Sequence, residues 1–391
     1  MRDVLNELLG WWEAGHSVGV ATVVATSSSA PRSPGAALLV GPEGVAVGSV
    51  SGGCVEGAVY DVAQEVIASG RPTLEKYGYS DETAFSVGLT CGGLIDIFVR
   101  RVDAESFPEL SGVAADVASG RPVAVAVVTA DRLHDRLGRH LVVRPAGAEP
   151  PPGGTGTLGD PCLDAVVTAD ARGLLALGKN STLRYGDSGQ RLGEGLEIFV
   201  ESFAPPPRML VFGAIDFAAA LSTAGAFLGY RVTVCDARAI FATPARFPAA
   251  DEVVVDWPHR YLRAEADGGR LDSRTVLCAL THDLKFDIPL LEVALRLPEP
   301  AYVGAMGSRR TVADRLARLR AEGLTTAELS RLSAPIGLDL GARTPEETAI
   351  SIAAEILAHR TGATASPLAQ LTGPIHDEGP EAHSSGRNRS T

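Results

Sequence analysis

Two glycine-rich segments in the first hundred residues each carry a cysteine. The first reads Ser51-Gly52-Gly53-Cys54-Val55-Glu56, and the second reads Thr90-Cys91-Gly92-Gly93. Glycines let a ligand approach the main chain closely and leave backbone N–H groups accessible to it. The first segment joins an expected strand to an expected helix, and a cysteine at a helix start should have a lowered pKa and more thiolate character. Thiolates are soft ligands that suit zinc, copper or a sulfur-rich molybdenum centre.

Cys54 and Cys91 are therefore candidate metal ligands, and the alternative is that both are small buried hydrophobic residues. The other three cysteines, Cys162, Cys235 and Cys278, are interpreted in the second way. No C-x-x-C pair occurs, so a disulfide framework or a zinc ribbon is not expected.

The sequence after Pro207 alternates strands with helices, which predicts a parallel, doubly wound, Rossmann-like sheet. The expected strands are 209–212, 231–235, 252–255, 275–280 and 301–303. A helix is expected over 309–321. A final helix opens with Thr344-Pro345-Glu346-Glu347, a capping box with proline at the first helical position. Its expected apolar face carries Ile350, Ala353, Ile356 and Leu357.

The first turn of this sheet only partly matches a dinucleotide site. Gly213 stands at the start of Gly213-Ala214-Ile215-Asp216, and Asp236 stands where a ribose-binding carboxylate would. The second glycine of the G-x-G-x-x-G pattern is replaced by Ile215, whose side chain would crowd a phosphate. Two interpretations stay open: an NAD(P) site, or a Rossmann fold that kept the acid and lost the phosphate turn.

Other turns at the carboxyl ends of the expected strands also carry polar residues, and ligands of open α/β sheets bind at that edge. Small residues, a hydroxyl and arginines at a helix start suit an anionic group. The alternatives are a backbone-bonded turn histidine and a solvated helix start. The candidate residues are His282 and Asp283, then Gly304, Ser308 and Arg309, then Gly337 and Asp339.

The first two hundred residues resemble a duplication. Val18 to Val24 recurs as Val123 to Val128, and three further matches follow in the same order. The expected α/β organisation is an α+β domain over 1–203, made of repeats at about 1–101 and 105–203, and a Rossmann-like domain over 208–362. Residues 363–391 are expected to form a disordered tail. The second repeat lacks both glycine-rich cysteine segments, so features unique to the first repeat are the candidates for function.

Composition excludes some classes of function. The net charge of −12 argues against a general nucleic-acid binder, which needs clustered Lys and Arg. No apolar run approaches the roughly 20 residues of a membrane helix, and the first residues lack a signal-peptide layout. A cytoplasmic protein is expected.

Four segments together resemble one family closely. They are Ser49 to Gly57, Gly88 to Gly93, Tyr302 to Arg309, and Pro335 to Glu347. The family is XdhC/CoxI, accessory proteins of xanthine dehydrogenase and related molybdenum hydroxylases. The likeness runs from about residue 1 to 362. Many members read more like G-x-G-H where this chain has Gly213-Ala-Ile215-Asp216, which puts nicotinamide binding in doubt.

The resemblance implies a chaperone that holds the mature molybdenum cofactor, presents it to a cysteine desulfurase for sulfuration, and passes it to the apo-hydroxylase. Some members are named xanthine dehydrogenase, although this chain has neither the iron–sulfur cysteines nor the length expected of that enzyme. A homodimer and no membrane partner are expected, and an NAD(P)-dependent oxidoreductase is the alternative. The implied cofactor site has one wall of Ser51 to Cys54, Glu56 and Cys91 to Gly93, and another wall on the Rossmann rim, with His282, Ser308 and Arg309.

Overall fold

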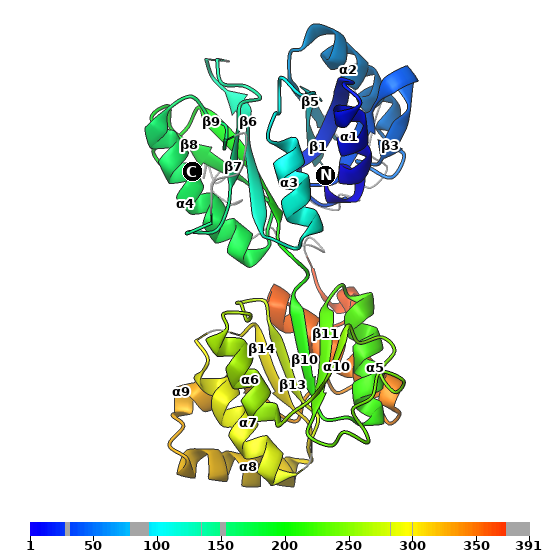
Figure 1. Ribbon diagram of the computed structural model, residues 1–391, viewed down its shortest axis with the longest axis vertical. Helices are drawn as coiled ribbons and strands as arrows, with labels where there is room; N and C mark the ends of the chain where they lie inside the picture. Colours follow the sequence, from blue (N-terminus) through cyan, green and yellow to red (C-terminus); the bar gives the residue numbers. More distant parts are fainter. Residues whose placement is uncertain are drawn as a thin grey trace, which may run out of the picture. The chain divides into compact units, whose positions relative to one another are not determined.

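The computed structural model describes residues 1–27, 32–78, 94–133, 135–148, 154–281, 283–298 and 300–372. Contacts within the chain divide it into two compact units, Met1–Pro205 and Pro206–Leu371 (Figure 1). The division falls within the proline run at 205–207, where residues without an N–H cannot continue a strand ladder. Each unit has its own apolar cores and is described by itself.

The first unit opens with a five-stranded antiparallel sheet in the order β3-β2-β1-β5-β4. The elements of this part, here called copy one, are η1 (Arg2–Val4), α1 (Leu5–Glu13), β1 (Val18–Ser27), β2 (Ala37–Val40), η2 (Pro42–Gly44), β3 (Ala46–Gly48), α2 (Glu56–Ser69), β4 (Thr73–Tyr77) and β5 (Leu94–Val102). Val18, Val20 and Val24 of β1 enter one apolar cluster, and Ala21 and Val23 enter another. Because side chains alternate across a strand, the sheet is buried on both faces.

The same arrangement occurs a second time in copy two. Its elements are α3 (Leu110–Ala118), β6 (Val123–Asp131), β7 (His140–Val143), α4 (Pro161–Leu177), β8 (Ser181–Tyr185) and β9 (Leu196–Phe203). The sheet order is β7-β6-β9-β8, which repeats the order β2-β1-β5-β4. The central strands carry the same irregularity, a register shift after Val23 in β1 and after Val128 in β6.

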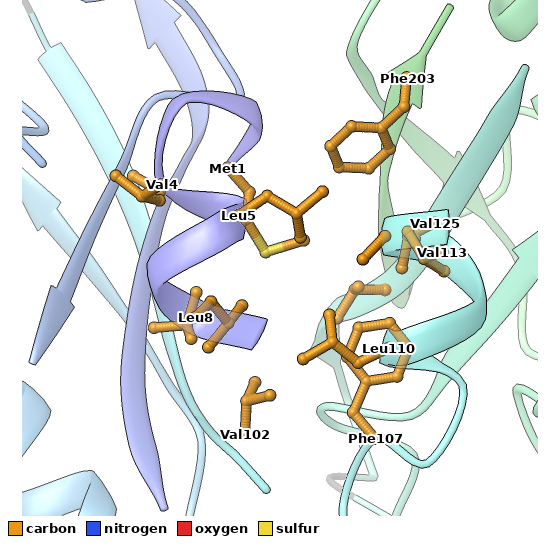
Figure 2. Close-up of a cluster of buried hydrophobic side chains, with 14 of the residues drawn as sticks. Met1, Val4, Leu5, Leu8, Val102, Phe107, Leu110, Val113, Val125 and Phe203 are labelled. Atoms are coloured by element: carbon orange, nitrogen blue, oxygen red, sulfur yellow. The ribbon is translucent and has the colours of Figure 1, made fainter. Parts of the chain in front are cut away.

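The two sheets share a central core that α1 and α3 complete. Figure 2 shows Met1, Leu5 and Leu8 lying opposite Leu110 and Phe203. Helix α2 covers the other face of the first sheet, and α4 covers the other face of the second. Each large apolar side chain that is fully buried in these layers contributes about 2 kcal/mol, so the layers fix where the loops at the sheet edges lie.

The second unit is a six-stranded parallel sheet in the order β12-β11-β10-β13-β14-β15. Its elements are β10 (Arg208–Phe212), α5 (Asp216–Phe227), β11 (Arg231–Asp236), β12 (Glu252–Val255), α6 (Pro258–Asp267), β13 (Val276–Ala279), α7 (Leu284–Arg296), β14 (Tyr302–Ala305), α8 (Arg309–Ala321), α9 (Thr326–Leu329), β15 (Leu332–Ser333), α10 (Pro345–Thr361) and η3 (Leu368–Gln370). Helices α5 and α10 cover one face, and α6, α7 and α8 cover the other (Figure 1). This confirms the Rossmann-like, doubly wound class. The strand order reverses between β10 and β13, which is where such sheets bind ligands.

Two details of this unit differ from the expectation. The short strand β15 was not expected, because two residues carry no periodicity. Ile350 is 59% exposed and does not lie on the apolar face of α10. That face is formed by Ala349, Ile352, Ala353 and Ile356, whose i, i+3, i+4, i+7 spacing turns Ile350 outward. The capping box at Thr344 and the helix start at Arg309 are confirmed.

Helix α10 ends at Thr361, and Gly362 closes it in the left-handed conformation. Residues 363–372 are exposed; the rest of the expected tail lies outside the described residues. In the part of the chain that the structure describes, no helix is both long and apolar enough to cross a membrane.

Candidate functional site

The loop between β3 and α2 closes around the carboxylate of Glu56. Ser49 Oγ donates to it at 2.8 Å, and the main-chain N–H groups of Gly52 and Gly53 donate at 2.9 and 2.8 Å. Ser51 donates twice, through its N–H at 2.9 Å and through its hydroxyl. Burial by itself would raise the pKa of Glu56, but the hydrogen bonds from Ser51 and Ser49 lower it to about 2. Glu56 is therefore ionised at neutral pH and is the anion around which the loop folds.

This arrangement differs from the expected one. The N–H groups of Gly52 and Gly53 were expected to face an anionic ligand, and they instead face Glu56 of the same loop. The Glu56 carboxylate would also repel an anion that approached it. Glu56 thus shapes the loop, and the loop ends at Cys54, which packs partly against the apolar cluster between the first sheet and α2.

Cys54 is half-buried and stands two residues before the start of α2. The Ser51 hydroxyl accepts hydrogen bonds from the N–H groups of Cys54 at 3.0 Å and Val55 at 3.1 Å. One serine therefore ties Cys54 to Glu56, because the same hydroxyl donates to the Glu56 carboxylate.

Copy two shows the same position with a regular helix start. Asp164 accepts from Thr157 Oγ1 at 2.7 Å and from the N–H of Leu158 at 2.8 Å, much as Glu56 does in copy one. Helix α4 already begins at Pro161, before its acid, and Asp160 caps it. Copy two therefore folds without the special loop.

Copy one replaces that helical turn with residues 52–55. Gly52 has a φ of 80° and Gly53 a φ of 120°, values that residues with side chains rarely adopt. Helix α2 begins only at Glu56. The fold does not require this loop, as copy two demonstrates, so its shape is a property specific to copy one.

Four of the candidate residues, Cys91, Gly92, Gly93 and His282, lie outside the described residues. Cys162, expected to be buried, is exposed in the first turn of α4, because only every third or fourth residue of that helix faces the sheet. Cys235 and Cys278 are buried as expected, and burial raises the pKa of both thiols. Among the described residues, no group of three or more His, Cys, Asp or Glu side chains is placed to hold a metal.

The turn after β10 keeps the first glycine of a dinucleotide turn, but its acid is already bound. Gly213 has a φ of 115°, and a Cβ there would lie 3.1 Å from the N atom of Thr281. Asp236 accepts from the N–H of Ala214 at 2.7 Å, and from the main chain and guanidinium of Arg238 at 2.7 to 2.9 Å. Burial would raise the pKa of Asp236, whereas these hydrogen bonds lower it. Asp236 is 2% exposed, so its carboxylate is not available to a ribose.

A buried polar network, which the sequence did not reveal, joins the turns after β13 and β14. Thr281 donates to Asp287, and Arg315 Nη2 donates to Asp287 at 2.5 Å and to the carbonyl of Met306 at 3.0 Å. Arg315 is fully buried and Asp287 nearly so. The signal was present: Arg315 sits among the apolar positions of α8, next to Leu316.

The remaining predicted residues divide into caps and packing positions. Ser308 caps α8 by accepting from the N–H of Thr311 at 3.1 Å, and Asp283 caps α7. A Cβ on Gly304 would lie 2.5 Å from Ile336, so this glycine serves packing. Arg309 is exposed at the helix start.

Gly337 also serves the fold. Its N–H donates to Glu355 of α10 at 2.6 Å, its φ is 104°, and a Cβ would lie 2.5 Å from Ser351 Oγ. Asp339 is exposed nearby in sequence. The predicted residues of the second unit that the structure describes thus lie at or near the carboxyl ends of its strands, and the β14–α8 turn there carries two exposed arginines, Arg309 and Arg310.

Comparisons with known proteins match both units. Residues 209–356 match the model of the XdhC Rossmann domain, and residues 11–78 and 116–186 match the model of the XdhC and CoxI family. The chain is 29% identical over 347 residues to a protein of Bacillus subtilis described as a probable subunit of xanthine dehydrogenase, and the match covers 87% of this chain and 92% of that protein.

It is also 26% identical over 359 residues to the molybdenum cofactor insertion chaperone PaoD of Escherichia coli, covering 92% of this chain and 88% of the chaperone. A crystal structure described as a xanthine dehydrogenase from Bacillus halodurans superposes with a TM-score of 0.64 at 25% identity. That match covers 94% of this chain and 97% of the other.

Proposed function

Because the chain belongs to the XdhC and CoxI family, we propose that it is an accessory protein that holds the molybdenum cofactor as cargo and delivers it to a molybdenum hydroxylase. Its relative PaoD, which matches along most of both chains, is a molybdenum cofactor insertion chaperone. We propose the same role for this chain, with an unidentified molybdenum hydroxylase as the enzyme that receives the cofactor.

One observation carries the proposal. Copy one has, in place of the regular helix start of copy two, a loop whose N–H groups bond to Glu56 and which ends at Cys54. A cysteine thiolate is a soft ligand that suits molybdenum. Cys54 is thus the residue that we propose contacts the metal end of the cargo, with Cys91 as the second candidate on the basis of its sequence motif.

The residues present fit an anionic cargo in one place and not in another. The glycine amides of the Cys54 loop are filled by Glu56 and are unsuited to a further anion. The β14–α8 turn presents Arg309 and Arg310, both exposed, at a helix start. An acidic protein must bind an anion through such local groups, because its net charge of −12 opposes binding.

The finer steps are part of the same proposal. The protein presents the cofactor to a cysteine desulfurase, and contact with the apo-hydroxylase triggers release. The chain's own contribution is to bind, to orient the metal end and to exclude water from it. We further propose that the protein acts as a homodimer, which light scattering of the purified protein tests.

The experiment has two arms. The purified protein is incubated with molybdenum cofactor, passed through a desalting column, and analysed for molybdenum by mass spectrometry. The loaded protein is then mixed with an apo-hydroxylase, and the recovery of hydroxylase activity is compared with that from free cofactor. Molybdenum retention followed by transfer supports the proposal, and an absence of retention contradicts it.

No second function is proposed. The oxidoreductase interpretation needs a free ribose-binding carboxylate, and Asp236 is occupied by Ala214 and Arg238.

A further inference from the structure

A row of unused hydrogen-bond donors begins α8. In the described ranges, the main-chain N–H groups of Gly307, Ser308, Arg309 and Arg310 donate to no protein acceptor. The Ser308 hydroxyl accepts a hydrogen bond only from the next N–H group along the chain, that of Thr311. Unpaired N–H groups at the start of a helix of 13 residues, together with its dipole, favour a bound anion.

A second observation comes from inside the unit. Arg315 uses Nη2 for Asp287 and Met306, but its Nε and Nη1 are buried and have no hydrogen-bond partner within the described part of the chain. Nη1 lies 3.5 Å from the place that a Cβ on Gly307 would occupy. The guanidinium therefore lies close to the turn, beside Thr311, whose Cβ is 3.3 Å from the same position.

These buried donors need an acceptor. A buried N–H without a partner costs about 1–3 kcal/mol, and Arg315 carries two such nitrogens. The carboxylate that contacts Arg315, Asp287, is shared with Thr281 and balances one positive charge. An oxyanion above Gly307 would add an acceptor and a negative charge on the side where Arg315 has neither.

The solvent side of the turn is also cationic. Arg309 and Arg310 are exposed, and neither takes part in an ion pair between described residues. Guanidinium groups bind the oxygens of phosphate in pairs, through parallel N–H bonds. Main-chain donors, a buried arginine and two exposed arginines thus converge on one turn.

The usual phosphate-binding position of a Rossmann sheet, the start of the first helix, is unsuited to a phosphate in this chain. At the start of α5, Ile215 stands at the N-cap and Asp216 is exposed in the first turn. The Ala214 N–H already donates to Asp236. A negative side chain at that helix start disfavours a phosphate there.

We infer that the β14–α8 turn, residues 306–310, is a binding site for a phosphate monoester. This inference rests on the proposed function: the ligand of the turn is the terminal phosphate of the pterin part of the molybdenum cofactor. Inorganic phosphate shares this chemistry and serves as the probe.

The test compares two double variants of the same helix. Arg309→Ala/Arg310→Ala removes two charges at the site, and Arg318→Ala/Arg320→Ala removes two exposed charges at the other end of α8. Inorganic phosphate is titrated into each full-length protein by calorimetry. We expect phosphate affinity to fall about tenfold, or 1.4 kcal/mol, in the first variant and to stay within roughly twofold of wild type in the second.

Two results would overturn the site: a wild-type protein that binds no phosphate, or an equal loss of affinity in both variants, which would indicate bulk charge alone. Molybdenum retention, measured on the same samples, separates this inference from the proposed function. Retention without site-specific phosphate binding overturns the site and leaves the chaperone proposal standing. Site-specific phosphate binding without molybdenum retention supports the site and contradicts the proposed cargo.

Discussion

Glu56 and Asp164 hold matching places in the two copies of the first unit: each carboxylate accepts a hydrogen bond from a hydroxyl seven residues earlier, Ser49 or Thr157. Glu56 additionally binds the N–H groups of the glycines before Cys54, and Asp164 has no such loop to bind. The acidic residue at this position stabilises the connection into the helix in both copies. In copy one it also holds the loop that ends at Cys54.

The contribution of Glu56 to the stability of the protein should be lost in acid. The folded pKa of Glu56, about 2, lies below its ordinary value of 4.5. Its contribution is therefore present above pH 4.5 and is lost as the pH falls towards 2. Allowing for solvent screening, we expect Glu56→Gln to lower the free energy of unfolding by about 1–2 kcal/mol at neutral pH.

Urea unfolding from pH 7 down to pH 2.5 checks this. The gap between wild type and Glu56→Gln should close through the window from 4.5 towards 2. A gap that stays constant across this window would show that the carboxylate charge is not what the loop needs.

The conformation of Gly53 should matter more than its size. Its φ is 120° and an added Cβ would meet no atom within 4 Å, so Gly53→Ala is strained without any clash. We expect it to cost about 1–2 kcal/mol and to weaken molybdenum retention. Gly57→Ala is the matched control, because Gly57 lies in α2 with open space around it and alanine favours a helix by about 0.5–1 kcal/mol. Equal stability of the two variants would contradict the strained loop.

The buried pair of Asp287 and Arg315 should be sensitive to loss of one partner. Asp287→Asn leaves the fully buried Arg315 without its counter-charge, at a cost of about 3–5 kcal/mol. Replacing both, as Asp287→Leu/Arg315→Met, should recover much of that loss, since no uncompensated charge remains. Denaturant unfolding of the three proteins measures this. A single variant that loses less than about 1 kcal/mol would show that the pair does not hold the turns together.

Nicotinamide nucleotides should not bind at the β10–α5 turn. Asp236 is engaged with Ala214 and Arg238, and Ile215 occupies the place of the second glycine. Titration with NADH and NADPH should leave the nicotinamide fluorescence without a saturable change. Saturable binding of NADH or NADPH would contradict this prediction and support the oxidoreductase interpretation.

Periodicity and turn chemistry predict most of the architecture. Alternating strands and helices after Pro207 predict the parallel sheet, and the capping box at Thr344 predicts the start of α10. Both signals are local, so a single sequence carries them. Ile350 shows the limit, because neighbouring apolar residues leave the orientation of a helix open until its packing partner is known.

The site was predictable only as a set of segments. The motif around Cys54 singles out the loop, but the occupant of its glycine amides, Glu56, depends on how the chain turns back on itself. Arg315 stands at the apolar spacing of α8 between Val312 and Leu319, but its partner Asp287 lies on another helix and does not follow from that spacing. Contacts of this kind depend on the fold and have no local pattern.

The central claim is that copy one presents Cys54 to the cofactor, and copy two supplies its own control, since Cys162 stands at the corresponding place in α4. Wild type, Cys54→Ala and Cys162→Ala are each incubated with molybdenum cofactor, desalted and analysed for molybdenum per protein. Loss of Cys54 should weaken retention roughly tenfold or more, as loss of a metal contact does, while Cys162→Ala retains as much as wild type. Equal retention by all three proteins would contradict the assignment of Cys54.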